Sequence, residues 1–132
     1  MSLHGRPCHD IVGLKGVIFV VLVYYDNYPT PYYRVPKYVY KIDETKELSW
    51  GAMLLYGVVL DRASLSRKNG WLDKEGKTYV YLSPKEGAEI MRTSPEAIKA
   101  FLEELLQSGL LEIKEQEDRA SRIYPKVVLG DY

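Results

Sequence analysis

Lysine and arginine side chains carry the clearest chemistry in this sequence, because their cationic groups bind phosphate oxygens. They gather in two stretches, residues 62–77 and residues 114–126. The first stretch has only Asp73 and Glu75 as acidic members, and the second also holds three acidic residues. Such clusters favour an anionic polymer, such as a nucleic acid, as the ligand. The basic residues are Arg62, Arg67, Lys68, Lys74 and Lys77 in the first stretch and Lys114, Arg119, Arg122 and Lys126 in the second.

Catalytic motifs are absent from the sequence. No phosphate-binding loop, dinucleotide fingerprint, HExxH zinc motif or GxSxG nucleophile elbow is present. A nucleophile–base pair would have to recruit His4 or His9 from the terminus. These histidines and Cys8 are metal-ligand types, but an unstructured terminus explains them better than a metal site. We therefore expect a protein that is not an enzyme, with no metal and no cofactor.

Composition indicates one folded domain. The chain has 132 residues, of which 46% are hydrophobic, and this is enough for a single core. The formal net charge is zero, whereas DNA-binding proteins usually carry a basic excess, so local clusters would have to supply binding. The one cysteine, Cys8, excludes an internal disulfide and favours a cytoplasmic location. The apolar run at residues 17–25 is shorter than the roughly 20 residues that span a membrane.

Three helices are predicted from residue 49 onward. Residues 49–60 are apolar on nearly all sides, which indicates a central buried helix with Ser49 as its N-cap. It should continue to about residue 65 or 66. Ser-Pro pairs at residues 83–84 and 94–95 each place an N-cap before a proline at the first helical position. The last helix should end before Gly109. It carries a one-sided apolar stripe made of Ile98, Phe101, Leu102, Leu105 and Leu106.

The N-terminal part is less regular. Residues 1–16 have no clear period and predict a loose arm, and residues 17–25 predict a buried strand. A turn-rich break follows at residues 26–31. The aromatic and basic segment 32–41 either lies on nucleic acid or packs on the core, and we favour packing. Pro36 could open a short helical turn there.

The second half adds short strands between and after the helices. Residues 78–82 predict a strand that pairs with residues 71–72 across a tight turn. Residues 110–114 and 122–129 predict a hairpin around the polar segment 115–121. The resulting order is helix, strand, helix, tight turn, helix and hairpin. This order predicts an α+β winged helix-turn-helix fold: a three-helix core with a β-hairpin wing, plus an extra N-terminal strand.

This fold would direct particular residues toward DNA. In a helix-turn-helix, the start of the second helix meets base edges, and a wing touches neighbouring phosphates. Glu96 and Glu103 either pair with Lys99 on the same helix face, or one of them accepts from a cytosine amino group. The predicted DNA-binding residues are Thr93, Ser94, Glu96 and Lys99 near the helix start, Arg67 and Lys68 in the first basic stretch, and Lys114, Arg119, Arg122 and Lys126 on the wing.

One long motif in the centre of the chain points to a known family. The run LLYG at residues 54–57 leads into LDRASLSRKNGW at residues 60–71, which is followed by Asp73, Gly76 and the YVY of residues 79–81. This gapless core resembles the N-terminal domain (RepA_N) of RepA-type plasmid replication initiators. Further matches are Pro36-Lys37, Glu104-Leu105, Gly109-Leu110 and Ile123-Tyr124.

The resemblance implies a winged helix that binds repeated double-stranded sites at a plasmid origin. Family members typically have a C-terminal domain that engages the host replication machinery, so host replication proteins are expected as partners only if such a domain exists here. Residues 32–129 would form this domain, and residues 1–31 would be an arm outside the family pattern. We expect a homodimer, with residues 17–25 as a candidate interface. The alternative is a winged-helix module for protein assembly without DNA specificity of its own, which the neutral net charge, Glu96 and Glu103 favour.

Overall fold

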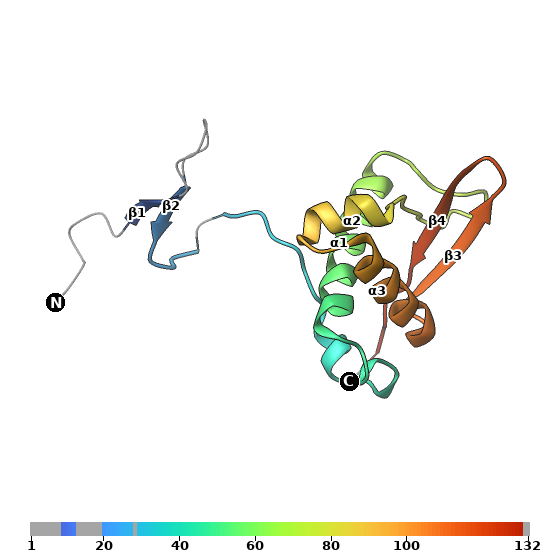
Figure 1. Ribbon diagram of the computed structural model, residues 1–132, viewed down its shortest axis with the longest axis horizontal. Coiled ribbons are helices and arrows are strands. Elements are labelled where there is room, and N and C mark those ends of the chain that lie inside the picture. The colour runs from blue at the N-terminus through green and yellow to red at the C-terminus, as the bar shows by residue number, and fades with distance from the viewer. Residues whose placement is uncertain (1–8, 13–19, 28, 131–132) are drawn as a thin grey trace. The chain divides into compact units, whose positions relative to one another are not determined.

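The computed structural model describes residues 9–12, 20–27 and 29–130, which fall into two units. The first unit, Met1–Tyr32, contains strands β1 (His9–Val12) and β2 (Val20–Val23), an antiparallel pair (Figure 1). The predicted loose arm is therefore wrong for residues 9–12, and its other residues lie outside the described part. A strand does form within residues 17–25, but Val21, Leu22 and Val23 are 49%, 56% and 45% exposed rather than buried. The reason is that the described residues of this unit form no second layer that could cover the two-stranded sheet.

The second unit, Tyr33–Tyr132, begins with a segment that packs against the core, through Val35, Tyr38 and Val39. Pro36 precedes a 3-10 helix at Lys37–Tyr40, and another 3-10 helix follows at Asp43–Thr45. Tyr38 and Val39 are buried, which confirms that packing, rather than ligand contact, explains these two residues. The Tyr38 hydroxyl contacts the Tyr56 hydroxyl, and Tyr56 in turn donates to the carbonyl of Lys126.

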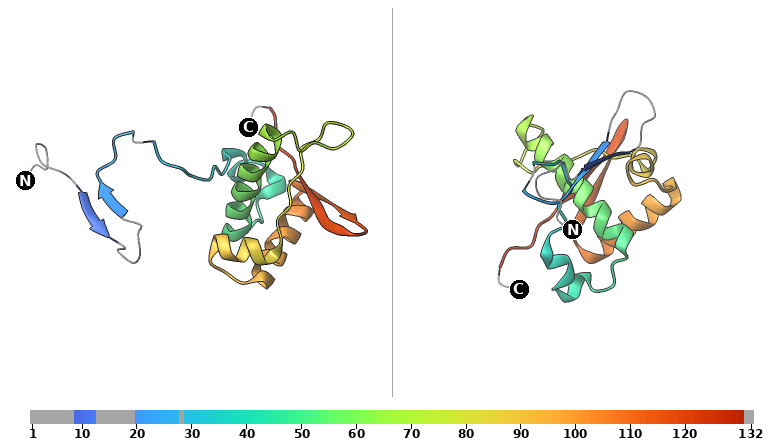
Figure 2. Two further views of the ribbon diagram at one scale, coloured as in Figure 1. Left: turned by 90° about the horizontal axis from the view of Figure 1, so that it is seen from above. Right: turned by 90° about the vertical axis from the view of Figure 1, so that its left-hand side faces the viewer.

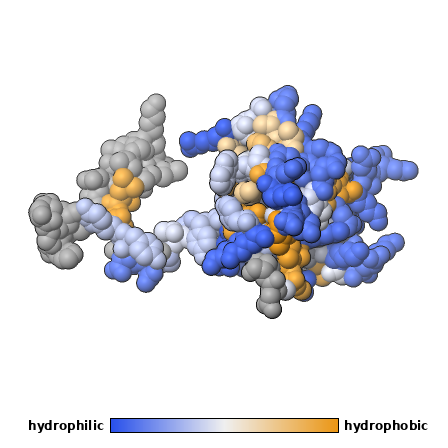
Figure 3. Space-filling view, turned by 90° about the horizontal axis from the view of Figure 1, so that it is seen from below, coloured by the Kyte–Doolittle hydropathy of each residue, from blue (hydrophilic) through white to orange (hydrophobic). Residues whose placement is uncertain are grey.

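Helix α1 (Trp50–Lys68) is the central element of this unit (Figure 1). Ser49 caps it as predicted, because its Oγ accepts from the Ala52 N–H at 3.2 Å. The helix ends two residues beyond the predicted limit, at Lys68. The prediction that residues 49–60 are buried on nearly all sides is wrong at Trp50 and Leu54, which are 73% and 55% exposed. Core residues from other elements pack against the buried side of α1. The surface of the molecule shows apolar patches among hydrophilic ones (Figure 3).

Helices α2 (Pro84–Met91) and α3 (Pro95–Ser108) begin at the two predicted Ser-Pro pairs. Ser83 and Glu86 form a reciprocal capping box at the start of α2. The tight turn between the helices places Arg92 in the left-handed region at φ 56°. Of the predicted stripe on α3, Ile98, Leu102 and Leu105 are buried, while Phe101 and Leu106 pack partly buried against the core. Gly109 ends α3 at φ 83°, a left-handed conformation that suits glycine.

Strands β3 (Leu111–Gln116) and β4 (Arg119–Pro125) form the predicted antiparallel hairpin (Figure 1). The predicted continuation of the second strand through residues 126–129 is wrong, because β4 ends at Pro125. Both strands extend into the polar segment 115–121, which was predicted to be the loop that connects them. The strands continue there because cross-strand hydrogen bonds stabilise polar residues even where they are exposed. The predicted strand at 78–82 is reduced to single bridges, Leu72 with Thr78 and Val80 with Ile123. The element order gives an α+β, winged-helix-like fold with an additional N-terminal hairpin.

Candidate nucleic-acid interface

The start of α3 presents four of the predicted contact residues to solvent: Thr93, Ser94, Glu96 and Lys99 are all exposed. The Ser94 Oγ accepts from the Ala97 N–H at 3.1 Å, so this side chain caps the helix. The positive end of a helix dipole at this position favours a phosphate or other anion.

Lys99 does not form the ion pairs that the spacing suggested. In the described part of the chain, the ion pairs are Arg62–Glu86, Lys77–Glu75 and Lys126–Glu112. Glu103 instead accepts from the side-chain amide of Gln107 at 2.9 Å. The Lys99 ammonium is thus not neutralised by a neighbouring carboxylate, which leaves its charge available to a ligand.

A groove beside the wing brings together residues from three distant parts of the sequence. Arg67 from the end of α1 and Lys77 from the following turn line it with Lys114 and Lys126 of the wing region. The groove is also lined by Asp73, Glu75 and Glu112. Two of its cations form ion pairs. The Lys77 Nζ lies 3.1 Å from the Glu75 Oε2, and the Lys126 Nζ lies 2.8 Å from the Glu112 Oε2.

Hydrogen bonds and charges in this groove lower the pKa values of two of its carboxyl groups. The Lys126 ammonium lowers the pKa of the Glu112 carboxyl through a hydrogen bond and charge attraction. Backbone N–H groups of Lys77 and Glu75 likewise lower the pKa of Asp73, whose Oδ1 accepts from both. The other two cations that line the groove, Arg67 and Lys114, form no ion pair with a described residue.

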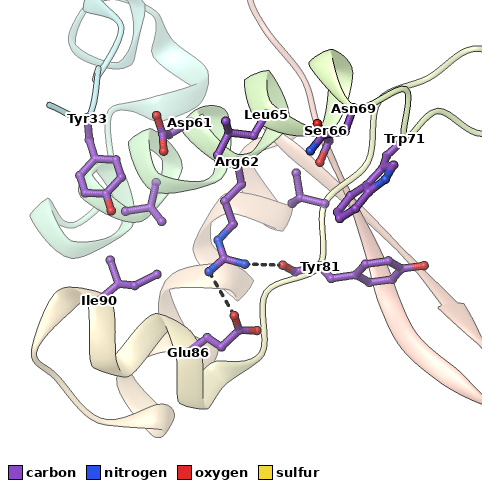
Figure 4. A pocket seen from close by; sticks show the side chains of 12 residues that line it. Tyr33, Asp61, Arg62, Leu65, Ser66, Asn69, Trp71, Tyr81, Glu86 and Ile90 are labelled. Carbon is purple, nitrogen blue, oxygen red and sulfur yellow. Dashed lines mark hydrogen bonds and ion pairs between the residues drawn. The ribbon is translucent and has the colours of Figure 1, made fainter. Parts of the chain in front are cut away.

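Arg62 does not belong to this basic surface, although the sequence placed it in the first cluster. Its Nη1 donates to the Tyr81 carbonyl and its Nη2 to the Glu86 carboxylate, each at 3.1 Å (Figure 4). The guanidinium therefore joins α1 to α2 and to the segment between them. Backbone hydrogen bonding at Ser83, followed by Arg62, lowers the pKa of Glu86.

Arg122 packs among tyrosines that were not among the predicted DNA-binding residues. Its guanidinium carbon lies 4.2 Å from the ring centroid of Tyr79. The Tyr79 ring also contacts those of Tyr81 and Tyr124, at centroid distances of 5.5 and 6.1 Å. The alternation of tyrosine and valine in residues 79–81 is the signal that could have placed these rings on one face.

The predicted residues do not form one continuous surface. Figure 2 shows α3 and the turn around residues 73–77 on opposite sides of the wing. Thr93, Ser94, Glu96 and Lys99 belong to the α3 side, whereas Arg67, Lys114 and Lys126 line the groove. Lys68 is exposed at the end of α1, and Arg119 is exposed where β4 begins.

Neither a membrane span nor a cluster of metal ligands is found among the described residues. In residues 9–12, 20–27 and 29–130, no helix has the length and apolarity needed to cross a membrane. No three His, Cys, Asp or Glu side chains of the described chain gather as metal ligands. His4 and Cys8, which the sequence offered as ligand types, lie outside these residues.

Comparison with known proteins places most of the chain in one family. Residues 31–129 match the model of the replication initiator protein A (RepA) N-terminus. A 41 kDa protein of Lactobacillus helveticus is 26% identical over 85 residues, which make up 64% of this chain and 24% of that protein. This chain therefore spans about a quarter of the length of that curated relative.

Solved structures share the fold. One described as a Rep-DNA complex has a TM-score of 0.68 at 25% identity, covering 77% of this chain and 79% of that chain. Another, described as an MDR initiator, has a TM-score of 0.65 at 27% identity, covering 76% and 80%. An N-terminal domain of a DNA-binding protein has a TM-score of 0.69 at 24% identity, covering 81% and 88%. The chain thus belongs to the family of RepA-type replication initiator N-terminal domains.

Proposed function

We propose that this domain binds double-stranded DNA with sequence preference, with the start of α3 against base edges and the wing against phosphates. The observation that carries this proposal is the family membership together with the likeness to a Rep-DNA complex. The exposed helix start supports it, because Lys99 has no carboxylate partner in the described chain. Arg67, Lys68, Lys114, Arg119, Arg122 and Lys126 would contribute sequence-independent affinity through phosphates.

The biological role that fits this activity is recognition of repeated sites at a plasmid origin, as the first step of replication. Repeats favour a dimer, because two copies of one domain can occupy two sites. The exposed apolar residues of β2 support self-association, since, among the described residues, each strand of the β1–β2 pair has one edge without a partner strand.

A charge substitution on α3 tests the DNA-binding mode. Lys99→Gln should weaken binding to a specific duplex about tenfold or more, because one base or phosphate contact is lost. Lys46→Gln is the matched control, since Lys46 is also exposed but lies in the loop that follows the second 3-10 helix. Fluorescence anisotropy with a labelled duplex measures both. Equal affinities for the two variants would contradict the α3 contact.

The second candidate function is a protein-assembly module. The zero net charge and the exposed acidic residues Glu96 and Glu103 favour it, because both act against binding of a polyanion. Under this function, Lys99→Gln combined with Arg122→Gln would leave DNA affinity unchanged. Removal of residues 1–31 would then alter the oligomeric state alone.

A further inference from the structure

The wing carries a polar face that is turned away from the helical core. Ile123 is buried and bridges to Val80, which is also buried. Because side chains alternate along extended chains, Arg122, Tyr124, Tyr79 and Tyr81 lie on the other face. This outer face borders the groove lined by Lys77, Lys114 and Lys126.

A like-charge pair lies in the middle of this face. Lys114 of β3 and Arg122 of β4 are directly opposite each other in the antiparallel register. Like charges in such positions destabilise a sheet. Neither residue belongs to an ion pair formed within the described residues. An anion between the two strands would turn this repulsion into attraction.

The tyrosines restrict the orientation of Arg122. The guanidinium stacks on Tyr79 at 4.2 Å, and the Tyr79 ring is itself held by edge contacts with Tyr81 and Tyr124. Arg122 Nε is buried, with no hydrogen-bond partner in the described chain, so the side chain is packed rather than free in solvent. A guanidinium held in one orientation loses less entropy on binding a phosphate than a freely rotating one.

We propose that Tyr79, with Tyr81 and Tyr124, positions Arg122 beside Lys114 to form a fixed binding site for one DNA phosphate. The inference rests on the proposed DNA-binding function. Figure 2 shows α3 and the turn around residues 73–77 on opposite sides of the wing, and that turn lines the groove together with Lys114 and Tyr124, so the phosphate belongs to duplex flanking the segment that α3 reads. Tyr79 is a positioning residue here, and Arg122 and Lys114 contact the ligand.

The salt dependence of binding separates positioning from a merely structural role. Arg122→Gln should reduce the slope of log affinity against log salt by about one unit, as expected for one lost phosphate contact. Tyr79→Leu should reduce the slope similarly, although it removes no charge. Tyr79→Phe retains the ring and should keep the wild-type slope. Tyr40→Leu is the control for removing a tyrosine ring elsewhere, since Tyr40 is exposed and contacts Trp50.

The double variant Tyr79→Leu/Arg122→Gln should bind no more weakly than Arg122→Gln, because both changes remove the same contact. Thermal unfolding of each variant establishes that titrations are made on folded protein. If Tyr79→Leu lowers thermal stability but leaves the slope unchanged, the tyrosine is structural and the positioning role is overturned. If Arg122→Gln also leaves the slope unchanged while Lys99→Gln weakens binding, the phosphate site is overturned and the proposed function stands. A wild-type domain that binds no DNA overturns the proposed function itself.

Discussion

Arg62 and Arg122 show how the fold gives two residues of one type different environments. Sequence alone grouped both with surface cations. In the structure, Arg62 pairs with Glu86 and the Tyr81 carbonyl, and Arg122 stacks on Tyr79. These partners come from distant parts of the chain, so no local spacing reveals them. By contrast, the exposure of Lys99 follows directly from its place opposite the apolar stripe of α3.

Glu104 gives a stability prediction at the same scale. Its two carboxylate oxygens accept hydrogen bonds from the N–H and the hydroxyl of Ser49, each at 2.8 Å. These bonds connect α3 to the start of α1. Glu104→Ala should lower the free energy of unfolding by about 1–3 kcal/mol, because partly buried donors lose a charged acceptor. Glu103→Ala is the control and should change it by less than about 0.5 kcal/mol, since Glu103 is exposed. Urea unfolding measures both, and equal losses would contradict the role given to Glu104.

The helices were predictable as elements because their start signals are local. Ser49, Ser83 and Ser94 each accept from a backbone N–H of the first turn, as their positions before apolar or proline-led segments predicted. The β segments were less predictable, because pairing depends on partners elsewhere. Residues 78–82 have the composition of a strand, yet only Val80 bridges to β4. β3 and β4 in turn extend through polar residues that composition assigned to a loop.

Packing of α1 on α3 supplies a prediction at the scale of elements. A Cβ added at Gly51 would lie 2.1 Å from the ring of Phe101, so Gly51→Ala should destabilise the domain by about 1–3 kcal/mol. In a Phe101→Ala background the obstruction is gone, and the same substitution should stabilise by up to about 1 kcal/mol through helix propensity. Thermal or urea unfolding of the four proteins measures this reversal of sign. A loss of stability in both backgrounds would show that the ring is not the cause.

At the scale of the whole molecule, a chain without net charge places most of its predicted DNA-binding residues on two separate surfaces, the start of α3 and the groove beside the wing. Figure 2 shows α3 and the turn around residues 73–77, which lines the groove, on different sides of the hairpin. Family and fold were predictable because the motif at residues 54–81 is long and the helix signals agree with it. The division of the surface was not predictable, because it depends on how the turn at residues 73–77 folds back against the wing.

The N-terminal unit carries a prediction about assembly. Removing residues 1–31 should convert the proposed dimer into a monomer, because the exposed apolar strand β2 would be lost. Light scattering after size-exclusion chromatography measures the mass of both proteins. Val21→Lys in the full chain is the matched test, since it changes one exposed residue of β2. An unchanged dimer in both cases would place the interface in residues 32–132.

The central claim is that the domain binds one double-stranded DNA sequence more tightly than others. The most direct measurement is the ratio of its affinities for a duplex carrying direct repeats from the DNA next to its coding sequence and for a shuffled duplex of equal length. The affinities are measured by anisotropy competition near 0.15 M salt and again at higher salt. The expected ratio is at least roughly 100, which is below the ratio of specific to non-specific affinity that is typical of complete DNA-binding proteins. A ratio within about threefold, with both affinities falling equally as salt rises, is the behaviour of non-specific binding and would contradict the claim.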